Sequence, residues 1–162
     1  VADTAASDEE AVLENKIAEY DAFLTKQDPA FTVEELEEAM QKVMDQYAGG
    51  IGTHYQFNEK QLAMAEEKIK KLQILAKGLA AADMHELMFI YELKERLTVC
   101  LTVIAHLRAR KETRWHSFAE NLDYPEKSDA WLCYVNSKKN GDQITMIRRD
   151  LVKGGETYEH RD

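Results

Sequence analysis

The stretch L-T-V-C-L-T-V-I-A-H-L-R-A-R-K-E-T-R-W-H-S, residues 97–117, decides the fold of this chain. Its first half is apolar apart from Thr98, Thr102 and His106, and it continues a pattern of apolar residues three or four positions apart that begins at Leu87. That spacing predicts one long helix. Because a helix that is apolar nearly all round is a buried one, we expect neighbouring helices to surround it.

Three further helices are predicted upstream, each with a recognisable start or end. The first begins near residue 8 and ends before Asp28-Pro29, since the residue before a proline avoids the helical region. The second and third begin at Thr32 and Asn58, and Asp83 opens the long fourth helix; each has a Glu or Gln three residues later. With short connections, these elements predict an all-α fold, an antiparallel three- to four-helix bundle.

The composition changes after residue 117. Residues 131–135 and 144–147 are short β-prone runs, and Asn140-Gly141 between them is a strong signal for a tight turn. We therefore expect a small C-terminal β-hairpin. The predicted organisation is a disordered terminus (1–7), a helical bundle (8–117), a loop and hairpin extension of the same domain (118–152), and a tail (153–162).

The net charge of −9 is distributed unevenly, with −10 in residues 1–60, +2 in residues 61–122 and −1 in the remainder. Overall acidity argues against nucleic-acid binding, which depends on neutralising phosphates. No apolar run approaches the ~18 residues of a membrane span, no signal peptide is visible, and the two cysteines lack metal or redox spacing. We therefore expect a cytoplasmic protein without membrane insertion. A start at Val1 instead of methionine favours a processed product or a fragment.

The sequence shows no catalytic or cofactor motif of its own. It contains neither G-x-G-x-x-G nor G-K-[ST], so we expect a phosphate-bearing cofactor to be bound by another part of the protein. Its histidines lack the spacing of metal ligands. His106 is expected to be a hydrogen-bonded core residue, while His54 either lines a cleft or closes the end of the bundle. We predict no catalytic, cofactor-binding or metal-binding residue in this chain.

Residues 108–117, R-A-R-K-E-T-R-W-H-S, place four cations and a tryptophan within eight residues. Cations at a helix C-terminus complement the helix dipole, which accounts for Arg108 and Arg110 but not for Trp115. The overall charge disfavours an anion or nucleic-acid patch. A docking surface against another domain that carries an anionic ligand or carboxylates fits best, because arginine and tryptophan are enriched at buried contacts.

Three motifs carry a family resemblance: A-R-K-E-T-R-W-H-S at 109–117, D-Y-P-E-K-S-D-A-W-L at 123–132, and L-x-x-x-M at 36–40 followed by Tyr47. Together they resemble the C-terminal region of fumarate reductase and succinate dehydrogenase flavoproteins, over about residues 31–152. Where the dicarboxylate enzymes have G-x-H after the arginine, this chain has Trp115-His116-Ser117. That departure, and Y-A-G-G before an aromatic loop, is similar to the alpha subunits of adenylylsulfate reductases.

The resemblance implies a spectrin-repeat-like C-terminal domain of a FAD-dependent oxidoreductase, packed on a FAD-binding domain that lies outside this chain. It implies FAD in the parent protein, an iron–sulfur subunit as a further partner, and no activity for this chain alone. Two alternatives stay open: a stand-alone helical protein-interaction module with an acidic first helix, and the equivalent domain of a fumarate reductase or succinate dehydrogenase-type enzyme. The residues expected to face the domain interface or a cleft are Arg110, Lys111, Arg114, Trp115, His116 and His54.

Overall fold

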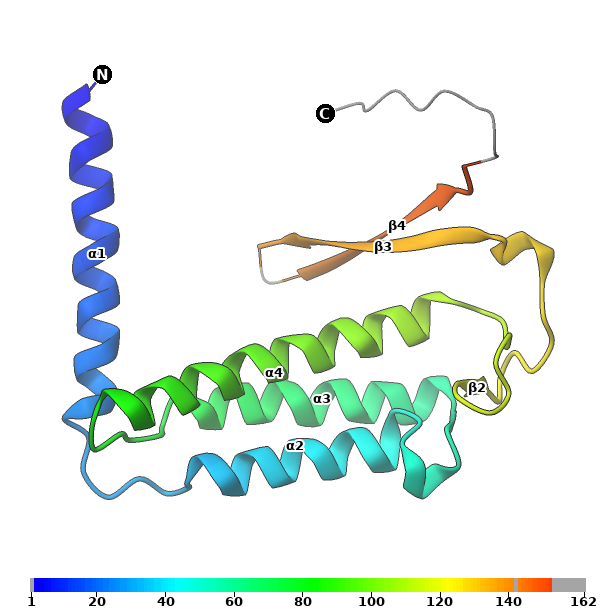
Figure 1. Cartoon of the computed structure of the whole chain (residues 1–162), viewed down its shortest axis with the longest axis horizontal. Helices are drawn as coiled ribbons and strands as arrows, with labels where there is room; N and C mark the ends of the chain where they lie inside the picture. The colour runs from blue at the N-terminus through cyan, green and yellow to red at the C-terminus, as the bar shows by residue number, and fades with distance from the viewer. Residues whose placement is uncertain (1, 142, 153–162) are drawn as a thin grey trace. The chain divides into compact units, whose positions relative to one another are not determined.

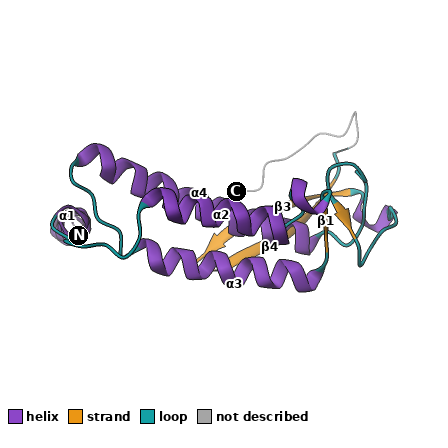
Figure 2. Ribbon diagram, turned by 90° about the horizontal axis from the view of Figure 1, so that it is seen from below, coloured by secondary structure: helices purple, strands orange, loops and turns teal. Residues whose placement is uncertain are grey.

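The computed structural model describes residues 2–141 and 143–152, and helices predominate among them (Figures 1 and 2). The helices are α1 (Ala2–Leu24), α2 (Val33–Tyr47), α3 (Glu59–Ala76) and α4 (Met84–Ala109), with short 3-10 turns at Ile51–Thr53 and Asp129–Trp131. Strands β3 (Cys133–Asn140) and β4 (Gln143–Asp150) form an antiparallel hairpin, and the two-residue strands β1 (Gln56–Phe57) and β2 (Glu120–Asn121) pair in parallel. A helical majority with a C-terminal hairpin confirms the predicted fold class at this level.

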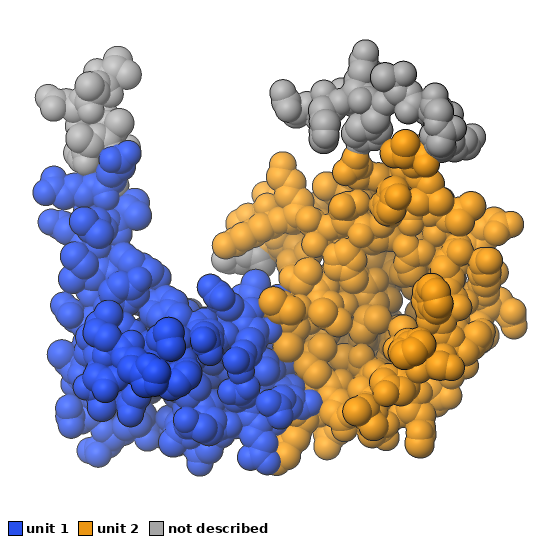
Figure 3. All heavy atoms as spheres, in the orientation of Figure 1, with its two compact units in different colours: residues 1–41, 69–98 blue, residues 42–68, 99–162 orange. Residues whose placement is uncertain are grey.

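The described chain forms two compact units, which are coloured separately in Figure 3. Unit 1 takes its residues from 1–41 and 69–98, and unit 2 takes its residues from 42–68 and 99–162. Helices α2, α3 and α4 therefore contribute residues to both units. The domain limits expected from the sequence stay a prediction, and the expected tail at 153–162 lies outside the described residues.

Unit 1 has a core built from apolar side chains of all four helices. Burying a Leu or Ile side chain contributes about 1.5–3 kcal/mol, so this core dominates the stability of the unit. Its buried members are Phe23, Leu36, Met40, Ile69, Leu72, Ala76, Leu79, Ala81, Leu87, Ile90, Leu93 and Leu97.

Helix α1 joins unit 1 through one cluster of aromatic and charged side chains. The rings of Tyr20 and Phe23 meet the ring of Tyr91 edge-on, at centroid distances of 5.4 and 6.2 Å. Beside them, the carboxylate of Glu19 lies 2.5 Å from the Lys94 ammonium of α4. Hydrogen bonds from lysine donors on α1 and α4 lower the pKa of Glu19 to about 2. The cluster therefore fixes the C-terminal half of α1 to α4.

Unit 2 buries fewer apolar side chains and relies more on polar contacts. Its buried apolar residues are Ala48, Phe57, Leu62, Ala65 and Ile104. Arg108, in the last turn of α4, forms ion pairs with two carboxylates of α3, Glu59 (2.7 Å) and Glu66. Arg108 therefore links α4 to α3 through these ion pairs, in addition to its predicted role as a helix-terminal cation.

The starts of α2, α3 and α4 form as the sequence predicts. At the start of α2, the Thr32 hydroxyl accepts a hydrogen bond from the Glu35 backbone N–H (3.2 Å), and the Glu35 carboxylate accepts one from the Thr32 backbone N–H (2.9 Å). This is the reciprocal capping box. Side-chain caps at the starts of α3 and α4 use Asn58 with Gln61 and Asp83 with Glu86.

The prediction that the fourth helix is covered on all sides is wrong for its C-terminal half. In unit 2, the α4 side chains of Val99 and Val103 are 60% and 41% exposed. Apolar residues on every face show that a helix can be covered all round, but they do not show that this chain supplies the cover. The open face of α4 is therefore a candidate contact surface.

Two element boundaries also differ from the sequence prediction. Asn140 pairs with Gln143 as the last residue of β3, so Asn140 belongs to the strand and not to the turn, and Gly141 follows it with a φ of 59°. A tight hairpin turn needs positive φ at its centre, and Gly141 supplies it as the first residue after the strand. Helix α1 begins at Ala2, inside the segment expected to be disordered.

Candidate domain-interface site

Glu112 lies buried between two arginines directly after α4. Its Oε1 lies 2.6 Å from Arg110 Nη1 and 2.5 Å from Arg114 Nε, and its Oε2 accepts a hydrogen bond from the Ser128 backbone N–H at 3.0 Å. Burial by itself raises the pKa of this carboxyl, but the hydrogen bonds from Arg114, Ser128 and Arg110 outweigh burial and hold the pKa below its usual range. Glu112 is therefore ionised and neutralises one of the two guanidinium charges.

The same arginines bind the main chain just ahead of β3 and at its first residue. Arg110 donates to the carbonyl oxygens of Trp131 (2.9 Å) and Cys133 (3.0 Å), and Arg114 donates to that of Ser128 (3.1 Å). Arginine offers five N–H donors in a planar fork, so each side chain serves a carboxylate and a carbonyl at once. The network thus attaches the start of the hairpin to the end of α4.

Thr113, which lies between Glu112 and Arg114 in the sequence, anchors an earlier part of the same loop. Its hydroxyl donates to the Tyr124 carbonyl oxygen (2.9 Å) and accepts from the Asn121 backbone N–H (3.0 Å). Its own backbone N–H donates to the Glu126 carbonyl oxygen (3.2 Å). Thr113 is buried, so these bonds satisfy polar groups that have no access to water.

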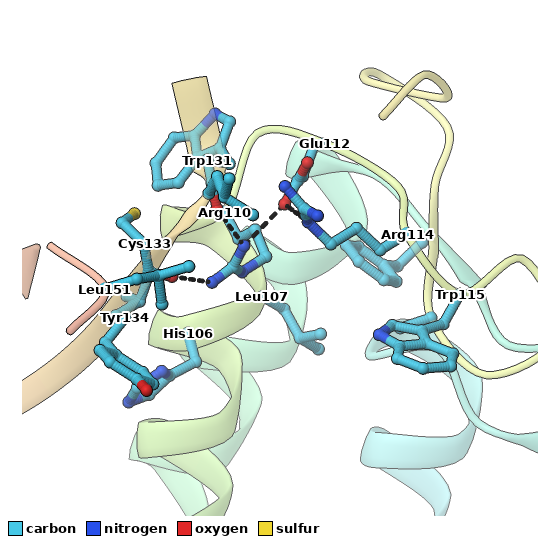
Figure 4. A pocket seen from close by; sticks show the side chains of 14 residues that line it. His106, Leu107, Arg110, Glu112, Arg114, Trp115, Trp131, Cys133, Tyr134 and Leu151 are labelled. Atoms are coloured by element: carbon cyan, nitrogen blue, oxygen red, sulfur yellow. Dashed lines mark hydrogen bonds and ion pairs between the residues drawn. The ribbon is translucent and has the colours of Figure 1, made fainter. Parts of the chain in front are cut away.

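A pocket of about 490 Å³ opens beside this network, within unit 2 (Figure 4). Arg110 and Arg114 converge on Glu112 along one side, and aromatic rings including Trp115, Trp131 and Tyr134 line it elsewhere. With two guanidinium groups against one carboxylate, this wall carries one surplus positive charge. The volume suits a small ligand or an inserted side chain, and the charge favours an anionic one.

Two loops that are far apart in sequence lie side by side next to the pocket. The Glu120 backbone N–H donates to the Tyr55 carbonyl oxygen (3.0 Å), and the Leu122 backbone N–H donates to that of Phe57 (2.8 Å). The rings of Tyr55 and Phe118 lie 6.4 Å apart. The loop that contains His54 therefore adjoins the turn that follows Trp115.

Large apolar side chains of these loops stand open to solvent. Trp115 and Phe118 are 69% and 71% exposed, and Ile51 is 75% exposed. Side chains of this size contribute strongly to binding when a partner covers them, and tryptophan is enriched at such contacts. Phe118 was missed by the sequence analysis, although its position three residues after Trp115 was a usable signal.

The six predicted interface residues divide into two groups. Trp115 and His116 are exposed, with His116 Nδ1 3.2 Å from the Glu120 carboxylate, and Lys111 and His54 are exposed as well. Arg110 and Arg114 are half-buried, and their guanidinium groups bind Glu112 and backbone oxygens of the same chain. An interface role for all six stays a prediction.

The part of the chain that the structure describes shows no group of three or more His, Cys, Asp or Glu side chains able to hold a metal ion. His106, predicted to be a core residue, is half-buried and lines the pocket. No helix within residues 2–141 and 143–152 combines the length and the apolarity that crossing a membrane requires.

A family model for the C-terminal region of fumarate reductase flavoproteins matches residues 37–156. The chain belongs to this family. Among curated relatives of this flavoprotein C-terminal domain is the adenylylsulfate reductase alpha subunit of Megalodesulfovibrio gigas. It is 34% identical over 98 residues, which represent 60% of this chain and 15% of that protein.

Solved structures extend the likeness of the flavoprotein C-terminal domain over nearly the whole chain. Adenylylsulfate reductase from Archaeoglobus fulgidus superposes with a TM-score of 0.82 at 31% sequence identity. Adenosine-5-phosphosulfate reductase in complex with sulfite, as a covalent adduct, superposes with a TM-score of 0.80 at 32% sequence identity. Each match covers 93% of this chain and 26% of the other. Quinol fumarate reductase of E. coli shares the fold, with a TM-score of 0.73 at 19% identity over 96% of this chain and 26% of its own. This chain therefore spans about a quarter or less of the length of these relatives.

Proposed function

We propose that this chain is the C-terminal helical domain of a FAD-dependent oxidoreductase subunit of the adenylylsulfate reductase type. Its identity to adenylylsulfate reductases is 31–34%, against 19% to the fumarate reductase, which supports this branch over the dicarboxylate enzymes. In this proposal the parent subunit acts on adenylylsulfate with FAD as cofactor and an iron–sulfur subunit as electron partner. The four helices form an antiparallel, spectrin-repeat-like bundle that packs on the FAD-binding domain of the same polypeptide.

The exposed aromatic surface at Trp115 and Phe118 is the observation that carries the domain-packing proposal. Two aromatic side chains, each more than two-thirds exposed, stand next to a pocket wall with one surplus positive charge. We assign this surface to the contact with the FAD-binding domain, with Trp115 filling a pocket there and Lys111, His116 and His54 around it. Arg110 and Arg114 shape the wall through Glu112, and the surplus charge faces a carboxylate or another anion across the boundary.

The test compares the full polypeptide with the 162-residue chain. We expect the gene to encode, upstream of this segment, a strand followed by G-x-G-x-x-G, the dinucleotide-binding pattern. The purified full polypeptide should carry stoichiometric FAD and the 162-residue chain none, as measured by flavin absorbance. Stoichiometric flavin on the short chain, or an upstream sequence without a dinucleotide motif, would refute the proposal.

The aromatic surface itself is tested in the full polypeptide. Trp115→Ala with Phe118→Ala should weaken the domain contact and speed flavin release. The reason is that the contact then lacks the apolar area that these two aromatic side chains bury. Phe89→Ala, which removes a 39% exposed aromatic of unit 1, serves as the matched control and should leave flavin release unchanged. Equal release rates for the double variant and the unmodified protein would remove this surface from the domain boundary.

A further inference from the structure

Helix α1 carries an apolar stripe that the described part of the chain leaves open to solvent. Val12, Leu13 and Ile17 are 69%, 60% and 49% exposed. Leu13 and Ile17 are four residues apart, which places them on one face of the helix, and Val12 borders that face. A helix with three adjacent exposed aliphatic side chains has the pattern of a helix that lies in a groove of a partner.

This stripe continues a contact that α1 already makes. Tyr20 packs against Tyr91 of α4, and Ile17 and Leu13 stand three and seven residues before Tyr20 on the same face. The contacts of α1 with α4 lie toward its C-terminal half, and Figure 1 shows the N-terminal turns of α1 running on beyond them. The packing face is therefore longer than the partner that unit 1 supplies for it.

The charges beside the stripe limit what can cover it. Glu9, Glu10 and Glu14 are exposed on the same turns, while the nearest cation, Lys16, pairs with Glu19. A second copy of α1 laid along the stripe would bring these carboxylates against one another, which is unfavourable. A groove with an apolar floor and a rim of Lys or Arg complements both features.

We propose that the Val12–Leu13–Ile17 stripe docks in a basic-rimmed apolar groove on the flavin-binding portion of the same polypeptide. The inference rests on the proposed function, which supplies that portion. The family match begins at residue 37, so α1 lies outside the matched C-terminal region. The solved relatives are also long enough to provide a groove, because this chain covers only 26% of each of them.

The experiment is limited proteolysis of the full polypeptide with a protease that cleaves after glutamate. Docking covers the turns that contain Glu9, Glu10 and Glu14, so cleavage there is slow in the unmodified protein. Leu13→Asp with Ile17→Asp removes the apolar contact, and cleavage within α1 should then become at least about tenfold faster, because it follows the population of the undocked state. In the 162-residue chain, the double variant should be cleaved at the rate of the unmodified chain.

The matched control is Ile74→Asp on α3. Ile74 is 66% exposed in the same unit and undergoes the same change of chemistry, yet it lies outside the stripe. We expect this control to leave the cleavage of α1 in the full polypeptide slow. Raising the salt concentration should speed the cleavage in the unmodified polypeptide, because exposed charge pairs at the rim are screened.

Two results would overturn the docking. One is a full polypeptide with bound FAD whose α1 is cleaved as fast before as after the double substitution. The other is a 162-residue chain that sediments as a dimer and is converted to a monomer by Leu13→Asp with Ile17→Asp, which assigns the stripe to a second copy. Absence of FAD from the full polypeptide is a different failure, because it refutes the proposed function itself.

Discussion

Replacing Glu112 with glutamine should lower the free energy of unfolding of the 162-residue chain by about 2–4 kcal/mol at pH 7. The substitution keeps the shape of the side chain but removes the charge that two guanidinium groups share. Breaking a buried ion pair by removing one partner costs about 3–5 kcal/mol. The side chains of Arg110 and Arg114 are 32% and 21% exposed, so water can solvate part of the charge that Glu112 leaves unpaired. We therefore expect a loss of about 2–4 kcal/mol, below that of a fully buried pair.

Thermal unfolding followed by tryptophan fluorescence measures the effect. At this chain length each kcal/mol lowers the melting temperature by about 2–4 °C, so Glu112→Gln should lower it by roughly 4–16 °C. Glu126→Gln, at an exposed carboxylate of the same loop, is the control and should change stability by less than about 0.5 kcal/mol. A Glu112→Gln chain as stable as this control would refute the view that the carboxylate fixes the loop.

The pH dependence gives a second check on the same residue. The folded pKa of Glu112 is lowered, so its contribution to stability is fully present above the unfolded pKa of about 4.3. That contribution is lost as the pH falls through the lower folded value. The stability gap between the unmodified chain and Glu112→Gln should therefore be constant from pH 7 to about 5 and should close in more acidic solution. A gap that widens on acidification contradicts the assignment.

Three further substitutions test the fold in the 162-residue chain. Leu97→Ala should lower the free energy of unfolding in urea by about 2–5 kcal/mol, because Leu97 is fully buried. Val99→Ala, at a 60% exposed position of the same helix, should lower it by less than about 0.5 kcal/mol. Equal losses would contradict the open face of α4. Thr32→Ala should lower stability by about 0.5–2 kcal/mol in thermal melts through loss of the α2 cap, and a neutral result would mean that the capping box contributes nothing. Glu19→Gln should lower the free energy of unfolding by less than about 1 kcal/mol, because the carboxylate is 36% exposed. This loss should disappear as the pH falls from about 4.3 toward 2, and it should shrink in high salt. A loss that changes with neither pH nor salt would exclude an ionic contribution.

The elements that the sequence predicted well are those that depend on neighbours a few residues away. A capping box such as Thr32 with Glu35 is complete within four residues, so its sequence specifies its geometry. Asn140 lies in β3 and not in the predicted turn, because register depends on the pairing of both whole strands, from Cys133 with Asp150 onward. The exposure of Val99 depends on what packs beside α4, and no local pattern contains that information.

The candidate site shows the same limit at longer range. The pattern of cations in residues 108–114 predicted side chains that face a partner, and the role of Glu112 between them was not predicted. In the structure, that carboxylate turns Arg110 and Arg114 toward their own chain. The carbonyl oxygens that complete their bonding lie 14–23 residues further along the chain, which no short motif predicts. The pairing of β1 with β2 brings the loop of His54 beside the Trp115 turn, and an interface role for His54 stays a prediction.

The residues that hold the loop ahead of the hairpin bind it by its backbone. Arg110, Thr113 and Arg114 contact carbonyl oxygens and N–H groups, which every amino acid except proline can offer in full. The path of the loop is therefore independent of most of its own side chains. Exposed positions such as Lys127 and Asp129 are free to mutate without displacing the loop. Substitutions in this segment can therefore change the side chains that it presents to a binding partner, while the backbone path of the loop is kept.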